Sequence, residues 1–185
     1  MKKLFVLLFI AMILIGCSEK ESKATIDKPK ANELLNQEAL EFIKKYNENV
    51  NFLNDGKNDI SRIEIIDAEN VGKINKEEKL DWQEIYRNSD YKISVKYNKD
   101  GGVIGYHLYI SGEDQYNNNG LAAAVIIIET LGLDRSLYRD KLNEMLNSPE
   151  EKETVDVLYE DQDYQVDLFD TKELGKLVMN FDKLE

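Results

Sequence analysis

The chain has 185 residues, and its 36 acidic side chains outnumber its 24 basic ones, which gives a formal net charge of −12 at pH 7. A chain this acidic is repelled by nucleic acid and by anionic lipid headgroups, so nucleic acid is excluded as an expected partner. Hydrophobic residues make up 42% of the chain and a single cysteine is present, which predicts a folded domain without a disulfide.

The first seventeen residues have the pattern of an export signal. Two lysines precede an uncharged apolar run over residues 4–16, which is shorter than the roughly 20 residues that a membrane-spanning helix needs. The run ends in Leu14, Ile15 and Gly16, followed by Cys17, and this ending resembles the lipobox of bacterial lipoproteins. An ordinary signal peptide with an incidental cysteine, or an uncleaved anchor, is the alternative interpretation.

The resemblance to the lipobox implies a location and an anchor. Residues 1–16 would be removed as a signal peptide, and Cys17 would carry a diacylglyceryl group that holds the protein at the outside of the cytoplasmic membrane. The signal and the size also resemble short Gram-positive lipoproteins, some of which stop phages or plasmids from entering the cell. Residues 17–31 are polar and contain Pro29, which predicts a flexible tether to a single domain over residues 32–185.

The first element of this domain is a helix over residues 32–53, for which Asn32 is a suitable cap. Apolar residues recur along it at spacings of three and four, which predicts one packing face. The residues of this stripe are Leu35, Ala39, Phe42, Tyr46, Val50 and Leu53.

The segment after this helix is harder to interpret. Residues 60–67 alternate around Ile63 and Ile65, which predicts a strand. Residues 68–87 are charged and irregular, with room for one helical turn. They hold the single tryptophan, Trp82, which we expect to fill a gap in the core or to contact a lid.

A β-hairpin over residues 91–110 is the clearest prediction in the chain. Residues 91–97 alternate strictly, Asp100 and Gly101 favour a turn with positive φ, and residues 103–110 return. One face of the hairpin should be buried and the other wet. The wet face would carry Lys92, Ser94, Lys96, Gly105, His107 and Tyr109.

Two helices should follow the hairpin. Residues 121–131 are apolar on nearly all sides, which predicts a helix buried against the sheet, and they are too few to span a bilayer. Gly132 ends this helix, and Asp134 caps a second one that runs to about Asn147.

Three short strands, over residues 154–160, 163–169 and 176–181, complete the domain, and the first two are joined by a tight turn at Asp161 and Gln162. The predicted fold class is therefore α+β, with an antiparallel sheet of about six strands and helices packed on one face. The order also permits two halves that each place three strands after a helix or a helix pair. This arrangement resembles the helix-on-saddle sheets of small periplasmic and extracellular binding or inhibitor domains.

The sequence contains no catalytic motif, so we expect neither an enzyme nor a cofactor. His107 is the single histidine, and no G-x-S-x-G turn accompanies it. Zinc sites use several Cys or His ligands. The carboxylates of residues 160–170 lack the central Gly and terminal Glu of a calcium loop, so no metal site is predicted. Carboxylate pairs suited to glycoside cleavage stay open, because nothing in an acidic sequence singles one out.

The remaining candidate is the wet face of the sheet, which would be basic on one hairpin and acidic on the other. We expect Lys96, Tyr109, Asp163 and Asp167 to bind an envelope protein or another envelope component. The alternative is a small-ligand or ion-binding lipoprotein that assists a transporter. A sheet face that is only solvated is the third interpretation.

Overall fold

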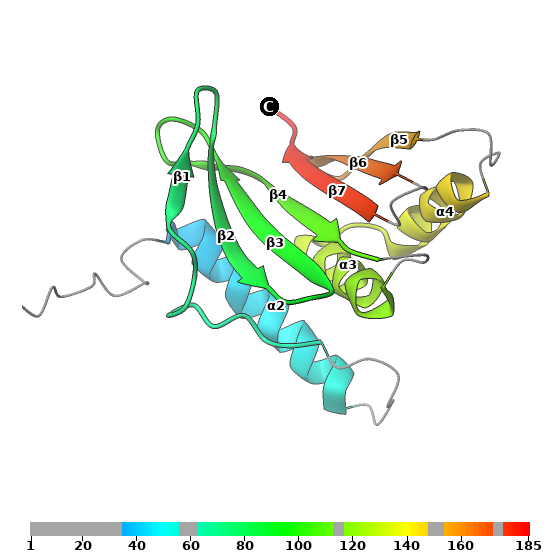
Figure 1. Ribbon diagram of the computed structural model, residues 1–185, viewed down its shortest axis with the longest axis horizontal. Coiled ribbons are helices and arrows are strands. Elements are labelled where there is room, and N and C mark those ends of the chain that lie inside the picture. Colours follow the sequence, from blue (N-terminus) through cyan, green and yellow to red (C-terminus); the bar gives the residue numbers. More distant parts are fainter. Residues whose placement is uncertain (1–34, 56–62, 113–116, 148–153, 172–175) are drawn as a thin grey trace, which may run out of the picture.

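The computed structural model describes residues 35–55, 63–112, 117–147, 154–171 and 176–185. The lipobox, Cys17 and the tether lie outside these residues. The described part forms three helices and seven strands (Figure 1). In chain order they are α2 (Gln37–Asp55), β1 (Ile74–Lys76), β2 (Asp81–Arg87), β3 (Tyr91–Tyr97), β4 (Val103–Ile110), α3 (Asn118–Leu131), α4 (Arg135–Leu146), β5 (Thr154–Asp161), β6 (Tyr164–Thr171) and β7 (Lys176–Lys183).

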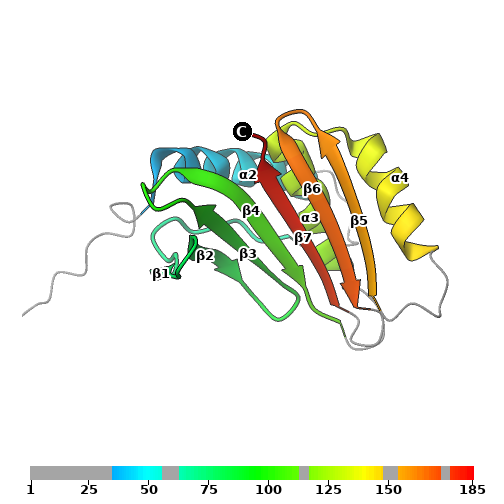
Figure 2. The ribbon, with the colours of Figure 1, turned by 90° about the horizontal axis from the view of Figure 1, so that it is seen from above.

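The strands form one antiparallel sheet in the order β1-β2-β3-β4-β7-β6-β5, so the last strand of the chain lies at the centre and joins the two hairpin groups. Helices α2 and α3 lie on the same face of this sheet, and α4 lies beside β5 (Figures 1 and 2). The predicted α+β class with an antiparallel sheet is confirmed. The described sheet has seven strands rather than about six, because four strands follow the first helix.

The core lies between the sheet and the two helices that cover it. The Phe42 ring of α2 stacks on Tyr106 of β4, with ring centroids 4.1 Å apart. Gly120 brings α3 close to β4, because a Cβ there would lie 2.4 Å from Cγ2 of Ile110. Because of these contacts, the apolar residues of the central strands that face the helices are almost completely buried.

Two of the expected helix boundaries are confirmed, since Gly132 ends α3 in the left-handed region with φ 77° and Asp134 caps α4. Helix α3 begins at Asn118, before the expected start at residue 121, because the Asn117 side chain caps it. The first helix differs, since Asn36 accepts a hydrogen bond from the Glu38 N–H at 2.7 Å. Asn32 lies outside the described residues. The last turn of α2 extends past the sheet, so Leu53 is 42% exposed although it was expected on the packing face.

The strand predicted around Ile63 and Ile65 was wrong for the residues that the structure describes. Residues 63–67 have no regular structure, with Ile63 and Ile66 buried and Ile65 exposed. The reason is a side chain of α2. Asn47 donates to the Ile66 carbonyl at 2.9 Å and accepts from its N–H at 2.7 Å, so this backbone bonds to the helix instead of to a strand.

The segment expected to be irregular forms β1 and β2. In β2, Gln83 is buried toward the helices, where it accepts a hydrogen bond from the Tyr97 hydroxyl at 2.7 Å. Trp82 therefore faces away from the helices and does not fill the core. The polar residue lies inside and the aromatic one outside, which reverses the usual pattern.

The β5–β6 turn is shifted by one residue from the expected Asp161 and Gln162. It consists of Gln162, with φ 53°, and Asp163.

Candidate functional site on the outer face of the sheet

The outer face is the face of the sheet turned away from α2 and α3. Paired residues of neighbouring strands point to the same face, so the register places outward side chains in lines across the sheet. The first line consists of Trp82, Lys96, Gly105 and Asp182, the second of Ser94, His107, Asn180 and Asp167, and the third of Lys92, Tyr109, Val178 and Phe169.

Lys96 is the centre of the first line and is only 4% exposed. Its ammonium forms an ion pair with Asp182, lies 5.7 Å from the centroid of the Trp82 ring, and is 3.5 Å from Oδ1 of Asn180. These contacts bury a cation on an open sheet, where a lysine is normally solvated. Lys96 therefore organises the neighbouring side chains and is not available to a partner, which corrects the expectation that it is exposed.

Gly105 makes the ion pair possible. It lies in β4 between Lys96 of β3 and Asp182 of β7, so the lysine reaches its partner across the glycine. A Cβ at this position would lie 2.3 Å from the Phe181 carbonyl oxygen and 2.9 Å from Oδ1 of Asp182. The absence of a side chain thus leaves the path open and lets β4 approach β7 closely.

Trp82, Lys96, Asn180 and Asp182 form a polar cluster on the outer face. His107 belongs to the same cluster. Its ring meets Trp82 edge to face, with centroids 5.4 Å apart, and its Nδ1 is buried without a hydrogen-bond partner among the described residues. Burial, together with the nearby cations Lys92 and Lys96, lowers the pKa of His107 to about 4. The imidazole is therefore neutral at neutral pH.

Asp167 faces the cluster from β6. Asn180 donates to its Oδ2 at 3.2 Å, so Asn180 links Asp167 to Lys96. Burial raises the pKa of Asp167 to about 6, and the neighbouring carboxyl of Asp156 contributes to the same rise. A carboxyl with this pKa titrates just below neutral pH, in the range where His107 would titrate in an unfolded chain.

The third line carries an apolar stripe, which we define as Tyr109, Val178, Phe169 and the neighbouring Leu158. The first three are cross-strand neighbours on β4, β7 and β6, and each is partly exposed. Leu158 of β5 is 58% exposed. The stripe ends at Lys92 on one side and at Asp156 on the other. Contiguous apolar groups with a polar rim are typical of protein interaction sites.

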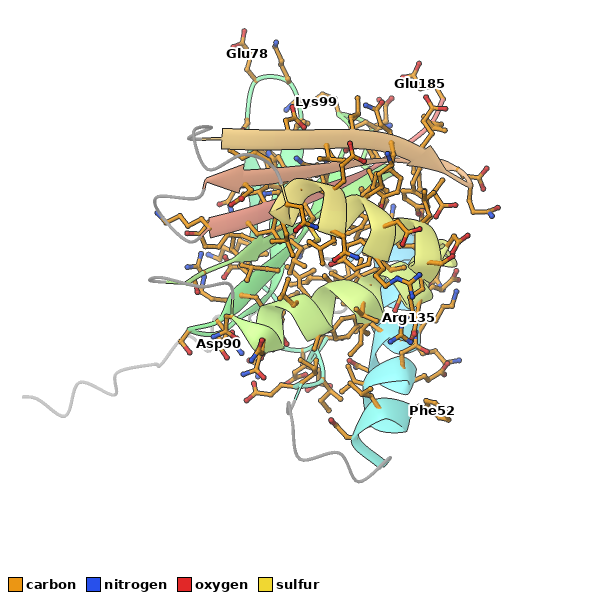
Figure 3. The ribbon with its side chains drawn as sticks, turned by 90° about the vertical axis from the view of Figure 1, so that its right-hand side faces the viewer. Phe52, Glu78, Asp90, Lys99, Arg135 and Glu185 are labelled. Carbon is orange, nitrogen blue, oxygen red and sulfur yellow. The ribbon has the colours of Figure 1, made fainter. Side chains whose placement is uncertain are left out.

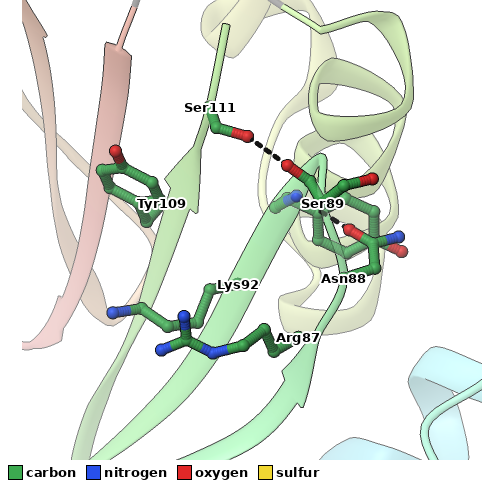
Figure 4. A pocket seen from close by; sticks show the side chains of 7 residues that line it. Arg87, Asn88, Ser89, Lys92, Tyr109 and Ser111 are labelled. Atoms are coloured by element: carbon green, nitrogen blue, oxygen red, sulfur yellow. Dashed lines mark hydrogen bonds between the residues drawn. The ribbon is translucent and has the colours of Figure 1, made fainter.

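A hollow of about 400 Å³ lies at the Lys92 end of the stripe, beside the β2–β3 turn. Its walls include Arg87, Ser89, Lys92, Tyr109 and Ser111 (Figure 4). The Lys92 ammonium lies 5.6 Å from the centroid of the Tyr109 ring. The hollow therefore presents two cations beside an aromatic ring that also belongs to the stripe.

The four residues predicted to bind a partner are distributed unevenly. Lys96 and Asp167 come together through Asn180, and Tyr109 lies on the stripe. Asp163 is exposed in the β5–β6 turn and belongs neither to the cluster around Lys96 nor to the stripe. Sequence reasoning missed the other participants of the outer face, which are Trp82, Asn180, Asp182, Val178, Phe169 and Leu158. The signal for the stripe was present, because β6 and β7 carry apolar residues on both faces.

Two of the acidic residues considered for calcium, Asp161 and Asp167, serve other contacts. Asp161 accepts the N–H of Asp134 at 2.6 Å, and so ties the start of α4 to β5. Within the described ranges, no three His, Cys, Asp or Glu side chains are grouped so that they could hold a metal ion.

None of the helices in those ranges has the length and apolar character needed to cross a membrane.

No protein-family model matches the chain, and neither a curated protein nor a solved structure is significantly similar to it.

Proposed function

We propose that this protein is a non-enzymatic lipoprotein, anchored through Cys17 at the outside of the cytoplasmic membrane, whose outer sheet face binds another protein of the envelope. The anchor is supported by the sequence Leu14-Ile15-Gly16-Cys17 after an apolar run of signal-peptide length. Two acyl chains on one cysteine would hold the domain stably, whereas a single chain binds membranes only marginally.

The apolar stripe is the observation that carries the binding function. The described helices cover only the opposite face of the sheet, so Tyr109, Val178, Phe169 and Leu158 keep exposed apolar surface on a chain of net charge −12. Burial of an apolar side chain contributes roughly 1.5–3 kcal/mol, so a partner that covers these four side chains gains a central, desolvated contact. The polar cluster beside the stripe fixes the shape of the face.

The anchor is tested by metabolic labelling with an alkyne fatty acid. The wild-type protein should take up the label and sediment with membranes, and Cys17→Ser should lose the label and keep its signal peptide. Labelling of Cys17→Ser to the same extent as the wild type would contradict lipidation at this residue.

The binding surface is tested by crosslinking in intact envelopes. The double variant Leu158→Ser with Val178→Ser should capture its partner about tenfold less than the wild type, because it removes two contacts of the stripe. The matched control is Phe52→Ser with Leu53→Ser, which removes two exposed apolar side chains from the far end of α2 (Figure 3). Equal capture by both double variants would argue against the sheet face.

A further inference from the structure

The hollow beside the β2–β3 turn contains an unusual pair of charges. Arg87 and Lys92 are direct cross-strand partners, so two cations face each other on neighbouring strands. Like charges in this position destabilise a sheet unless an anion lies between them. The pair is more unexpected because acidic residues exceed basic ones by 36 to 24 in this chain.

Of the two cations, only Arg87 is bound directly by a carboxylate. Arg87 binds the Glu84 carboxylate through Nε at 2.8 Å and Nη2 at 2.6 Å. Lys92 forms no hydrogen bond or ion pair with any residue that the structure describes. Its ammonium lies 5.6 Å from the centroid of the Tyr109 ring, and the Glu84 carboxylate attracts it only through space. Figure 4 shows the Lys92 and Arg87 side chains extending toward the same side of the hollow. The pair therefore has an excess positive charge with room for a ligand.

The other polar groups of the hollow hold the turn together. Asn88 accepts hydrogen bonds from the N–H groups of Asp90 and Tyr91, each at 2.9 Å. Ser111 donates to the Ser89 carbonyl at 2.5 Å. These bonds fix the walls, so an anion would be recognised mainly by Lys92 and by the outer edge of Arg87.

We propose that the hollow binds a carboxylate of an acidic peptide segment, and that apolar side chains of the same segment lie along the stripe. Tyr109 belongs to both the hollow and the stripe, so the two form one continuous surface. A free inorganic anion could use the cations but not the stripe, whereas a peptide can use both. This inference rests on the proposed protein-binding function, and it adds the chemical class of the segment that is recognised.

The test uses the purified full chain in detergent and two short peptides, acetyl-Phe-Leu-Glu-amide and acetyl-Phe-Leu-Gln-amide. Backbone amide shifts are followed by NMR during titration. The glutamate peptide should shift the signals of Arg87, Lys92 and Tyr109 and bind about tenfold more tightly than the glutamine peptide, as expected for a charge-assisted contact. Equal affinity for the two peptides would overturn the proposal.

Variants assign the effect to the hollow. Lys92→Gln should remove the preference for glutamate, while Lys45→Gln, an exposed cation on α2, should leave it unchanged. The melting temperature of each variant is measured to confirm that it folds. If Lys92→Gln still prefers the glutamate peptide, the assignment to the hollow is overturned. If inorganic phosphate binds as tightly as the glutamate peptide, the proposal is also overturned, and a small-anion site is favoured.

The two proposals can fail separately. If capture in envelopes requires the stripe but is unaffected by Lys92→Gln, the carboxylate site is wrong and the protein-binding face stands. If the glutamate peptide binds as expected and the stripe variants capture their partner normally, the carboxylate site stands and the proposed function is wrong.

Discussion

The ammonium of Lys96 reaches the carboxylate of Asp182 across an entire strand. The two residues lie on β3 and β7, and Gly105 of β4 separates them. The lysine side chain is 5% exposed and the aspartate side chain 49% exposed, so the cation is buried and the anion is half in water. This asymmetry determines how the cluster on the outer face should respond to substitution.

We predict that the two halves of this ion pair contribute unequally to stability. Asp182→Ala leaves a buried ammonium without its counter-ion and should lower the free energy of unfolding by about 2 kcal/mol. Lys96→Met keeps the stem packed against Trp82 and leaves a carboxylate that water can solvate, so it should cost less than about 1 kcal/mol. Urea unfolding measures both, and a larger loss for Lys96→Met would contradict this account.

Gly105 gives a second prediction about the same contact. In Gly105→Ala the new methyl group would meet the β7 backbone at Phe181, so the strands must separate and the variant should lose about 2–3 kcal/mol. Gly102→Ala is the matched control on the same hairpin, because its Cβ would approach only the Asn98 side chain, at 3.2 Å. Similar thermal stability for the two variants would rule out a close approach of the strands at Gly105.

The alternation of apolar and polar residues predicted β3 to β7 well, because each of these strands has an inner face turned toward the helices. It failed at residues 63–67, where the backbone bonds to Asn47, a side chain of α2 that lies 19 positions before Ile66. It failed again in β2, because the inward Gln83 is satisfied by Tyr97 from another strand. In both cases a contact with a distant residue replaced the local pattern.

The outer-face cluster was beyond sequence reasoning for a related reason. Lys96 was placed correctly on the outward side of its strand, but its burial depends on Trp82, Asp182 and Asn180, which come from β2 and β7. Alternation assigns a residue to a face and does not give the order of strands in a sheet. Since β7 inserts between β4 and β6, the neighbours of Lys96 could not be read from the chain order.

Asn47 provides a third prediction. Asn47→Ala would leave the N–H and carbonyl of Ile66 without their partner in a partly buried position, so the variant should lose about 1–3 kcal/mol. Hydrogen exchange at the Ile66 amide should accelerate strongly, because the bond that protects it is gone. Asn51→Ala, on the exposed side of the same helix, is the control. Unchanged protection of Ile66 in Asn47→Ala would refute the assigned contact.

His107 and Asp167 should act on stability in opposite directions as the pH falls. The pKa of His107 is lowered from 6.5 to about 4, so between these values the unfolded chain binds more protons and acid destabilises the fold. The pKa of Asp167 is raised from 3.8 to about 6, so over nearly the same range the folded chain binds more protons and acid stabilises it. In the wild-type protein the two effects oppose each other.

Single variants should separate these effects. Relative to the wild type, His107→Gln should become more stable at pH 4.5 than at pH 7, and Asp167→Asn less stable, each by about 1 kcal/mol. Urea unfolding at the two pH values measures the difference. The same pH dependence in both variants as in the wild type would show that neither group titrates differently on folding.

The central claim is that the apolar stripe on the outer face contacts an envelope protein directly. A photoreactive amino acid placed at Val178 in the full, membrane-anchored chain tests it in intact cells, with the same amino acid at Phe52 as the reference position. We predict a discrete crosslinked protein from position 178 that position 52 does not give. No adduct at position 178, or the same adducts from both positions, would contradict the account.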